Sequence, residues 1–177
     1  MLGLPFSILP ALIDENPLNQ TDPLNLTRGL AIKKVEKVID VMKSRLPKWI
    51  CGADTVIAAE NKIFGKPADR EEASLMLKKL SGEQHKVFTS LALYNGNEKK
   101  IDCRSASCTV TFASLTNEEI EWYLSTNEWQ GAAGAYRIQG LAACLITEIN
   151  GSPSTVAGLP LHEFYAMLRD NGYPYGA

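Results

Sequence analysis

An apolar, β-branched run that ends in a tight turn constrains the fold of this chain more than any other stretch. The run covers residues 51–59 (CGADTVIAA) and is typical of a buried strand. Glu60 and Asn61 follow, and since asparagine tolerates a positive φ, they predict a two-residue turn and a β-hairpin. The hairpin carries an unpaired carboxylate, Asp54, on one strand and Lys66, in a Gly-Lys-Pro corner, on the other. These residues fit either an ordinary hairpin or a site for a metal-bound, negatively charged substrate.

Composition excludes several classes of protein. The 177 residues are 45% hydrophobic and 21% charged, which is ordinary for one globular domain. A net charge of −2 gives no general attraction to nucleic acid or to an anionic membrane. No apolar run approaches the length of about 20 residues that spans a bilayer, and the N-terminus lacks the basic region of a signal peptide. We therefore expect a cytoplasmic protein that binds neither nucleic acid nor membrane.

The cysteines and histidines give little sign of a zinc site. None of the four cysteines forms a C-x-x-C pair, and the two histidines lie far from them in the sequence. An even number of cysteines permits disulfides, but without secretory signals we expect buried free thiols in a reducing compartment.

Spacing and capping signals predict a mixture of helices and strands. Thr27 is the expected N-cap of a long helix, Asp69 with Glu72 and Thr116 with Glu119 form capping boxes, and Asn95-Gly96 is a hairpin signal. The expected elements are a short strand over 5–12, a polar loop over 16–25, helices over 28–46, 69–80, 116–126 and 160–170, strands over 86–94, 105–113 and 141–149, and a loop over 131–140. This pattern predicts the α/β class with a mixed sheet.

Several motifs in the sequence resemble those of the Maf (septum formation inhibitor-like) nucleotide pyrophosphatases. They are GADTVIAAENKIFGKP at 52–67, ADREEASLMLKKLSG at 68–82, GAYRIQG at 134–140 and GSPSTVAGLPL at 151–161. The resemblance implies one Maf/ITPase-like α/β domain over residues 1–177, with a mixed twisted sheet, flanking helices and two lobes around a cleft. It also implies a hydrolase that converts dTTP or UTP to the monophosphate and pyrophosphate and so sanitises the nucleotide pool.

The resemblance assigns roles to four charged residues. Asp54 matches the proton acceptor that activates water, and Glu15 with Asp54 matches the catalytic carboxylates that hold a divalent cation, Mg²⁺ or Mn²⁺. Lys34, in the segment LAIKKV, and Lys66 match lysines that bind phosphate oxygens. Three other lysines of the same helix are interpreted as a solvated face: Lys33, Lys37 and Lys43.

Base selection is assigned to two further positions. Thr55 and Gln139 resemble the pair typical of family members that prefer dTTP and UTP, and an amide offers both a donor and an acceptor to a pyrimidine edge. Gly131-Ala132 departs from the Asp-Lys of most members and removes one positive charge, which Arg137 would restore near the cleft.

One element of the family pattern is absent from this sequence. Family members begin with a strand and a Ser-x-Ser-Pro-Arg-Arg loop that holds the triphosphate, whereas this chain starts at Met1-Leu2-Gly3, which corresponds to the end of the following helix. We therefore expect residues 1–177 to turn over dTTP and UTP poorly. The alternative is a catalytically impaired Maf-like remnant that acts as a nucleotide-binding or division-associated interaction protein. The implied partners are a nucleoside triphosphate and a second copy in a homodimer.

Overall fold

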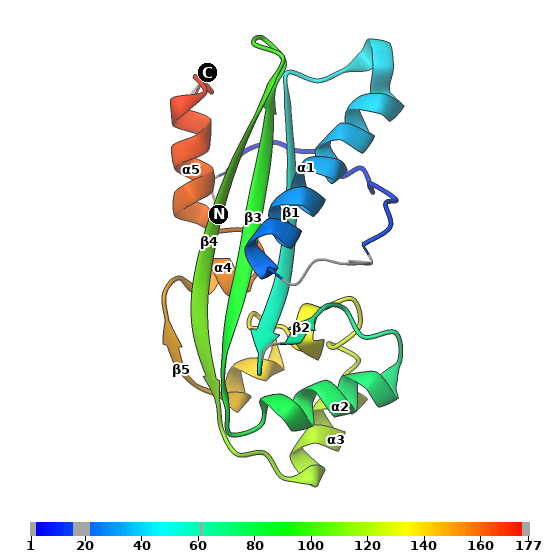
Figure 1. The fold of residues 1–177 in the computed structure, drawn as a ribbon, viewed down its shortest axis with the longest axis vertical. Coiled ribbons are helices and arrows are strands. Elements are labelled where there is room, and N and C mark those ends of the chain that lie inside the picture. The colour runs from blue at the N-terminus through cyan, green and yellow to red at the C-terminus, as the bar shows by residue number, and fades with distance from the viewer. Residues whose placement is uncertain (1–2, 16–21, 61, 175–177) are drawn as a thin grey trace.

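A sheet of five strands in the order β2-β1-β3-β4-β5 forms the centre of the structure, a computed structural model that describes residues 3–15, 22–60 and 62–174 (Figure 1). The strands are β1 Trp49–Ala59, β2 Lys62–Phe64, β3 Gln84–Asn95, β4 Lys100–Phe112 and β5 Ile146–Asn150. The α/β class is confirmed, but every pairing between the described strands is antiparallel, so the expected mixture of strand directions is wrong for this part of the chain. The reason is that the two long connections, residues 65–83 and 113–145, lie at the same end of the sheet, where Ala58 pairs with Lys86 and Phe112 pairs with Ile146.

The predicted hairpins are present. Ala59 pairs with Lys62, which confirms the tight turn, and Glu60 has a φ of 48°. The turn's second residue, Asn61, lies outside the described residues. Asn95 pairs with Lys100, so β4 begins five residues before the predicted strand at 105.

The first helix starts earlier than predicted. α1 spans Pro23–Met42 and is followed by a 3₁₀ turn at Lys43–Arg45. Its N-cap is Asp22, whose carboxylate accepts hydrogen bonds from the backbone N–H of Leu24 and Asn25. Proline is favoured at the first helical position because it has no N–H to satisfy, so Pro23 opens the helix and the predicted cap, Thr27, lies inside it. The expected polar loop is therefore wrong over 23–25, where the chain is helical, and right at Asp22; its other residues, 16–21, lie outside the described part.

The other predicted helix starts are confirmed. α2 (Arg70–Leu80) is capped by Asp69, and α3 (Asn117–Ser125) has the reciprocal capping box of Thr116 and Glu119. α5 spans Leu161–Asp170, and a short helix that was not predicted, α4, spans Pro153–Val156. No helix in the described ranges is long and apolar enough to cross a membrane.

One predicted strand is wrong, and another is right only in its second half. Residues 5–12 form no strand, because Pro5 and Pro10 lack a backbone donor and the segment pairs with no strand among the described residues; Phe6 and Ile8 are 80% and 83% exposed. The strand predicted over 141–149 forms over 146–149, as part of β5, whereas Leu141–Leu145 is a 3₁₀ segment. Among the described strands β5 pairs only with β4, and it is largely exposed rather than buried.

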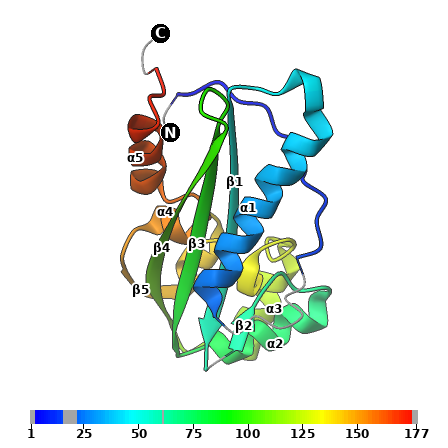
Figure 2. The same ribbon diagram turned by 45° about the horizontal axis from the view of Figure 1, so that its top comes forward.

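Helices cover both faces of the sheet (Figures 1 and 2). Successive residues of a strand point to opposite faces. In β1 and β3, even-numbered residues such as Ile50 and Ala92 pack against Val35 of α1, whereas odd-numbered residues such as Leu91 pack against Met167 of α5. This alternation determines which face of the sheet each side chain of β1 points to.

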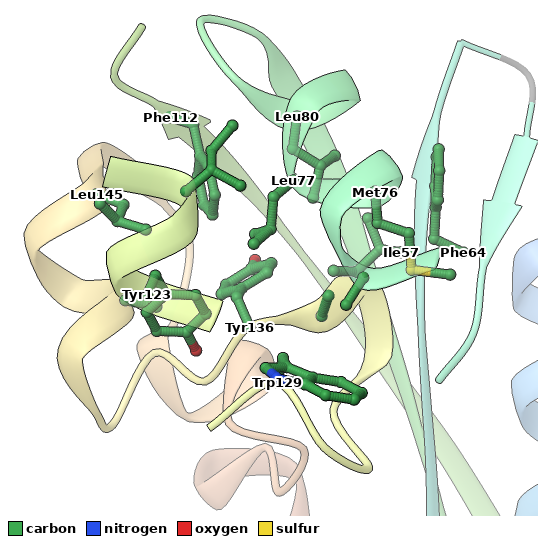
Figure 3. Close-up of a cluster of buried hydrophobic side chains, with 14 of the residues drawn as sticks. Ile57, Phe64, Met76, Leu77, Leu80, Phe112, Tyr123, Trp129, Tyr136 and Leu145 are labelled. Carbon is green, nitrogen blue, oxygen red and sulfur yellow. The ribbon is translucent and has the colours of Figure 1, made fainter. Parts of the chain in front are cut away.

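A separate group of helices lies beyond one end of the sheet, where both long connections are made. We call α2, α3 and residues 129–145 the helical lobe. Its core, shown in Figure 3, joins side chains of the sheet with those of the lobe: Ile57, Phe64, Met76, Leu77, Leu80, Phe112, Tyr123, Trp129, Tyr136 and Leu145. A backbone hydrogen bond of 2.9 Å from Gly134 N to Gly65 O ties the lobe to the corner that carries Lys66.

Candidate functional site

β1 presents its polar residues to both faces of the sheet. Asp54 points toward α1, and its side chain is only 6% exposed. Its neighbour Thr55 points to the opposite face, which α4 covers. There its hydroxyl contacts Thr89 of β3, which in turn bonds Thr155 of α4. β2 pairs with β1 only at residues 57–59, so β3 alone flanks positions 54 and 55 among the described strands. A ligand at this edge can therefore reach groups on both faces.

Lys34 of α1 occupies the centre of the charged cluster. Its ammonium donates to Asp54 Oδ1 at 2.7 Å and to Ala53 O at 3.2 Å, and it lies 2.8 Å from Glu15 Oε1. Burial alone would lower the pKa of Lys34, but the hydrogen bonds to Asp54 and Glu15 outweigh burial and raise it above its usual value. The predicted solvated face of the helix is confirmed, because its three lysines are exposed: Lys33, Lys37 and Lys43.

Glu15 links the two predicted phosphate-binding lysines. Lys66, which follows β2, donates to Glu15 Oε2 at 2.6 Å, while Lys34 contacts the other oxygen. Burial would raise the pKa of Glu15, yet the two ammonium groups together lower it below its ordinary value. The carboxylate is therefore ionised at neutral pH and holds both lysines on one side of the cavity.

Asp54 is the less satisfied of the two carboxylates. Burial raises its pKa above the ordinary value, although Lys34 opposes the shift. Its second oxygen, Oδ2, is buried and has no hydrogen-bond partner among the described residues. An unpaired buried carboxylate oxygen is unfavourable unless it takes a proton or a cation, so Asp54 is suited to either task.

Asp54 and Glu15 fit a divalent cation that needs few protein ligands. No group of three or more histidine, cysteine or acidic side chains that could hold a metal ion occurs in the part of the chain that the structure describes. Mg²⁺ typically binds one or two carboxylates and completes its coordination with water and substrate phosphates. The free oxygen of Asp54 and the hard carboxylate donors match that pattern.

A cavity of about 240 Å³ brings the predicted site residues together. Lys34, Asp54, Thr55, Lys66 and Gln139 all line it, and Glu15 reaches it through its contacts with both lysines. The remaining walls come from β1, β3, the helical lobe, and α4 with the loop that follows it, and include Ala132, Tyr136, Arg137, Val156 and Gly158.

Arg137 has a different position from the one expected. Its guanidinium donates to Glu128 O at 2.9 Å and to Gln130 O at 2.6 Å, so those donors hold the loop that carries Gln139. The side chain still lines the cavity. The expected replacement of a lost positive charge is thus only partial, because these donors already have acceptors.

Two supporting groups escaped the sequence analysis. His85 of β3 is buried and contacts the Tyr136 hydroxyl at 2.9 Å, which anchors the cavity wall to the sheet. Burial lowers the pKa of His85 to about 4, so the ring is neutral at physiological pH. Thr89 is fully buried behind Thr55. Both lie on one strand, but only the register with β1 and the contact with the lobe reveal their connection to the cavity.

Known proteins resemble this chain over almost its whole length. The sequence profile of the Maf-like proteins matches residues 1–171. A dTTP/UTP pyrophosphatase of Symbiobacterium thermophilum is 41% identical over 174 residues, which are 98% of this chain and 87% of that protein. The dTTP/UTP pyrophosphatase of Pelotomaculum thermopropionicum is 40% identical over 172 residues, or 97% and 88%, and that of Zymomonas mobilis is 41% identical over 174 residues, or 98% and 84%.

Proposed function

Because this chain belongs to the Maf family, we propose that it hydrolyses dTTP and UTP to the nucleoside monophosphate and pyrophosphate. The observation that carries the proposal is the convergence of Lys34, Asp54 and Lys66 on one cavity, with Glu15 bridging the lysines. Lysines neutralise phosphate oxygens, and an adjacent carboxylate accepts a proton from water.

In the proposed reaction, the oxygen of water forms a bond to the α-phosphorus and the bond to the oxygen that bridges to the β-phosphorus breaks. Asp54 accepts the proton of the attacking water, which its raised pKa favours. Lys34 and Lys66 bind the phosphate oxygens and stabilise the negative charge that moves to the leaving pyrophosphate. Glu15 and Asp54 would hold a divalent cation, which when bound lowers the pKa of a coordinated water and neutralises phosphate charge.

The direct test is product analysis with the full chain, Mg²⁺ and each nucleoside triphosphate in turn. We expect pyrophosphate and the monophosphate from dTTP and UTP at a low rate, since the Ser-x-Ser-Pro-Arg-Arg loop is absent from residues 1–177, with ATP and GTP turned over more slowly still. Release of orthophosphate and a diphosphate would contradict the proposed bond cleavage. Tight nucleotide binding without any turnover would instead support the alternative of a nucleotide-binding remnant.

The location and assembly of the protein are part of the proposal. Cys51, Cys103, Cys108 and Cys144 are all free thiols, although only Cys108 is buried. Free thiols are typical of a reducing compartment and support a cytoplasmic location. The homodimer that the family resemblance implies stays a prediction, which analytical ultracentrifugation of the full chain would test.

Gln139 is expected to select the base. The Gln139→Glu variant replaces an amide donor with an acceptor, so a pyrimidine carbonyl loses its hydrogen bond. An unpaired polar group costs about 1–3 kcal/mol, which predicts a roughly 5- to 150-fold fall in kcat/KM for UTP and dTTP relative to GTP. Gln130→Glu adds the same charge to this loop at a residue that does not line the cavity, and serves as the control. An unchanged UTP-to-GTP ratio in Gln139→Glu would show that the base is recognised elsewhere.

The proposed base predicts a pH profile. Asp54 must be ionised to accept a proton, so kcat/KM should rise with pH through a pKa above the ordinary value of 3.8. Lys34 lowers the pKa of Asp54, and Lys34→Met should therefore move this rise to higher pH as well as reduce turnover. Lys33→Met removes a neighbouring exposed lysine and should leave the profile in place. A rise at the same pH in Lys34→Met would argue against Asp54 as the titrating group.

A further inference from the structure

Three oxygen atoms form a chain behind the wall of the cavity. Thr55 Oγ1 lies 2.9 Å from Thr89 Oγ1, and Thr89 Oγ1 donates to the backbone oxygen of Thr155 at 2.8 Å. Thr89 and Thr155 are buried, at 0% and 1% exposure, while Thr55 lines the cavity. These hydrogen bonds therefore connect α4, through β3, to the surface of the cavity that a ligand would contact.

The distances fix the direction of both hydrogen bonds. A carbonyl oxygen only accepts, so the proton between Thr89 and Thr155 belongs to Thr89. A hydroxyl has one proton, and Thr89 has none left for Thr55. Two oxygens 2.9 Å apart need a proton between them, which Thr55 must supply. The hydroxyl of Thr55 can then only accept a hydrogen bond from a ligand.

The space beside Thr55 leaves its oxygen accessible. Gly158, which also lines the cavity, has a φ of +92°, a conformation that favours glycine. A Cβ at Gly158 would lie 3.3 Å from Thr55 Oγ1, so a side chain there would crowd the hydroxyl. Gln139 lines the same cavity and offers both a donor and an acceptor.

We propose that Thr89 is a positioning residue for base selection, because it holds Thr55 as a hydrogen-bond acceptor that selects a ring N–H. This inference rests on the proposed function and names the chemical feature that the site recognises. Uracil and thymine carry a hydrogen on N3, whereas N3 of cytosine is an acceptor and would face the lone pairs of Thr55. The site therefore favours UTP and dTTP over CTP through a residue that does not itself contact the nucleotide.

Thr89→Val tests the proposal with little change of shape. Thr155 O keeps its hydrogen bond from Gly158 N, so the variant leaves no buried carbonyl unpaired. Without Thr89 as acceptor, the Thr55 hydroxyl can turn and donate to N3 of cytosine. We expect the UTP-to-CTP ratio of kcat/KM to fall by about fivefold or more, the effect of one hydrogen bond. Thr89→Ser retains the hydroxyl and should retain the parental ratio.

Ser90→Ala is the matched control. Ser90 is the next residue of β3 and is equally buried, but its hydroxyl lies on the opposite face of the sheet, where it contacts Thr27 of α1 at 2.7 Å and Ser105 of β4 at 2.8 Å. We expect this variant to lose stability without a change in the UTP-to-CTP ratio. A ratio that fell equally in Ser90→Ala and Thr89→Val would overturn the proposal, since general packing of β3 would then explain both.

Binding separates this proposal from the proposed activity. Calorimetry with the non-hydrolysable α,β-imido analogues of UTP and CTP measures base selection without turnover. If the full chain prefers the UTP analogue but hydrolyses nothing, the activity is wrong and the change of the binding ratio in Thr89→Val still decides the role of Thr89. Equal affinity of the parent for the two analogues, or an unchanged preference in Thr89→Val, would overturn it.

Discussion

Asp54→Asn should lower the rate of pyrophosphate release from dTTP and UTP by about 100- to 10,000-fold, the contribution typical of a positioned general base. The amide has nearly the same shape as the carboxylate but cannot accept the proton of water. Lys34 keeps its ion pair with Glu15 at 2.8 Å, so Glu15 still connects Lys34 to Lys66 in this variant. Steady-state assays with Mg²⁺ measure the effect, and turnover near the parental rate would exclude Asp54 as the proton acceptor.

The same variant should remain folded. The folded-state pKa of Asp54 is raised, so ionisation of this carboxyl makes the native state less stable above that pKa than below the ordinary value of 3.8. Asparagine carries no such cost but loses the charge that pairs with Lys34, so the free energy of unfolding at neutral pH should stay close to that of the parent. Asp102→Asn, in the ion pair with Arg104 away from the cavity, is the control for turnover.

The position of Asp54 could be predicted because it depends on local sequence. The β-branched run and the tight turn define β1 and β2, and period-two alternation then places Asp54 and Thr55 on opposite faces. The pairing of Glu15 with Lys34 and Lys66 could not be predicted from the residues alone. It requires the extended segment 3–15 to pass beside α1, and no local signal encodes that path.

Local signals also explain which elements of the fold were predicted well. Asp69 and Thr116 accept hydrogen bonds from backbone N–H groups three residues later, so the local sequence alone predicts where these helices start. The first half of the strand predicted over 141–149 is wrong for the opposite reason. Its apolar residues are needed at the junction with the helical lobe, where Ala142 and Leu145 pack in a 3₁₀ turn. Periodicity alone does not distinguish such a turn from a buried strand.

Gly134 is the position where we expect the largest loss of stability in the helical lobe. Its φ is +64°, and a Cβ there would overlap Ile57 Cδ1 in the core shown in Figure 3. A left-handed conformation costs a side-chain-bearing residue about 1–2 kcal/mol, and overpacking a core typically costs about 1–3 kcal/mol more. Gly134→Ala should therefore lower the free energy of unfolding by about 2–5 kcal/mol, measured by urea denaturation.

A matched glycine and a second substitution separate the cost of the left-handed backbone conformation from the cost of overpacking the core. Gly131 has a φ of +69°, but the nearest atom to its added Cβ, Arg137 Nη2, is 3.8 Å away, so Gly131→Ala should show only the backbone cost of about 1–2 kcal/mol. Ile57→Val removes the Cδ1 atom that the new methyl group would meet. In a double-mutant cycle, Gly134→Ala should therefore be less destabilising in the Ile57→Val background than in the parent. Additive effects would show that the left-handed backbone, rather than contact with Ile57, makes glycine necessary at this position.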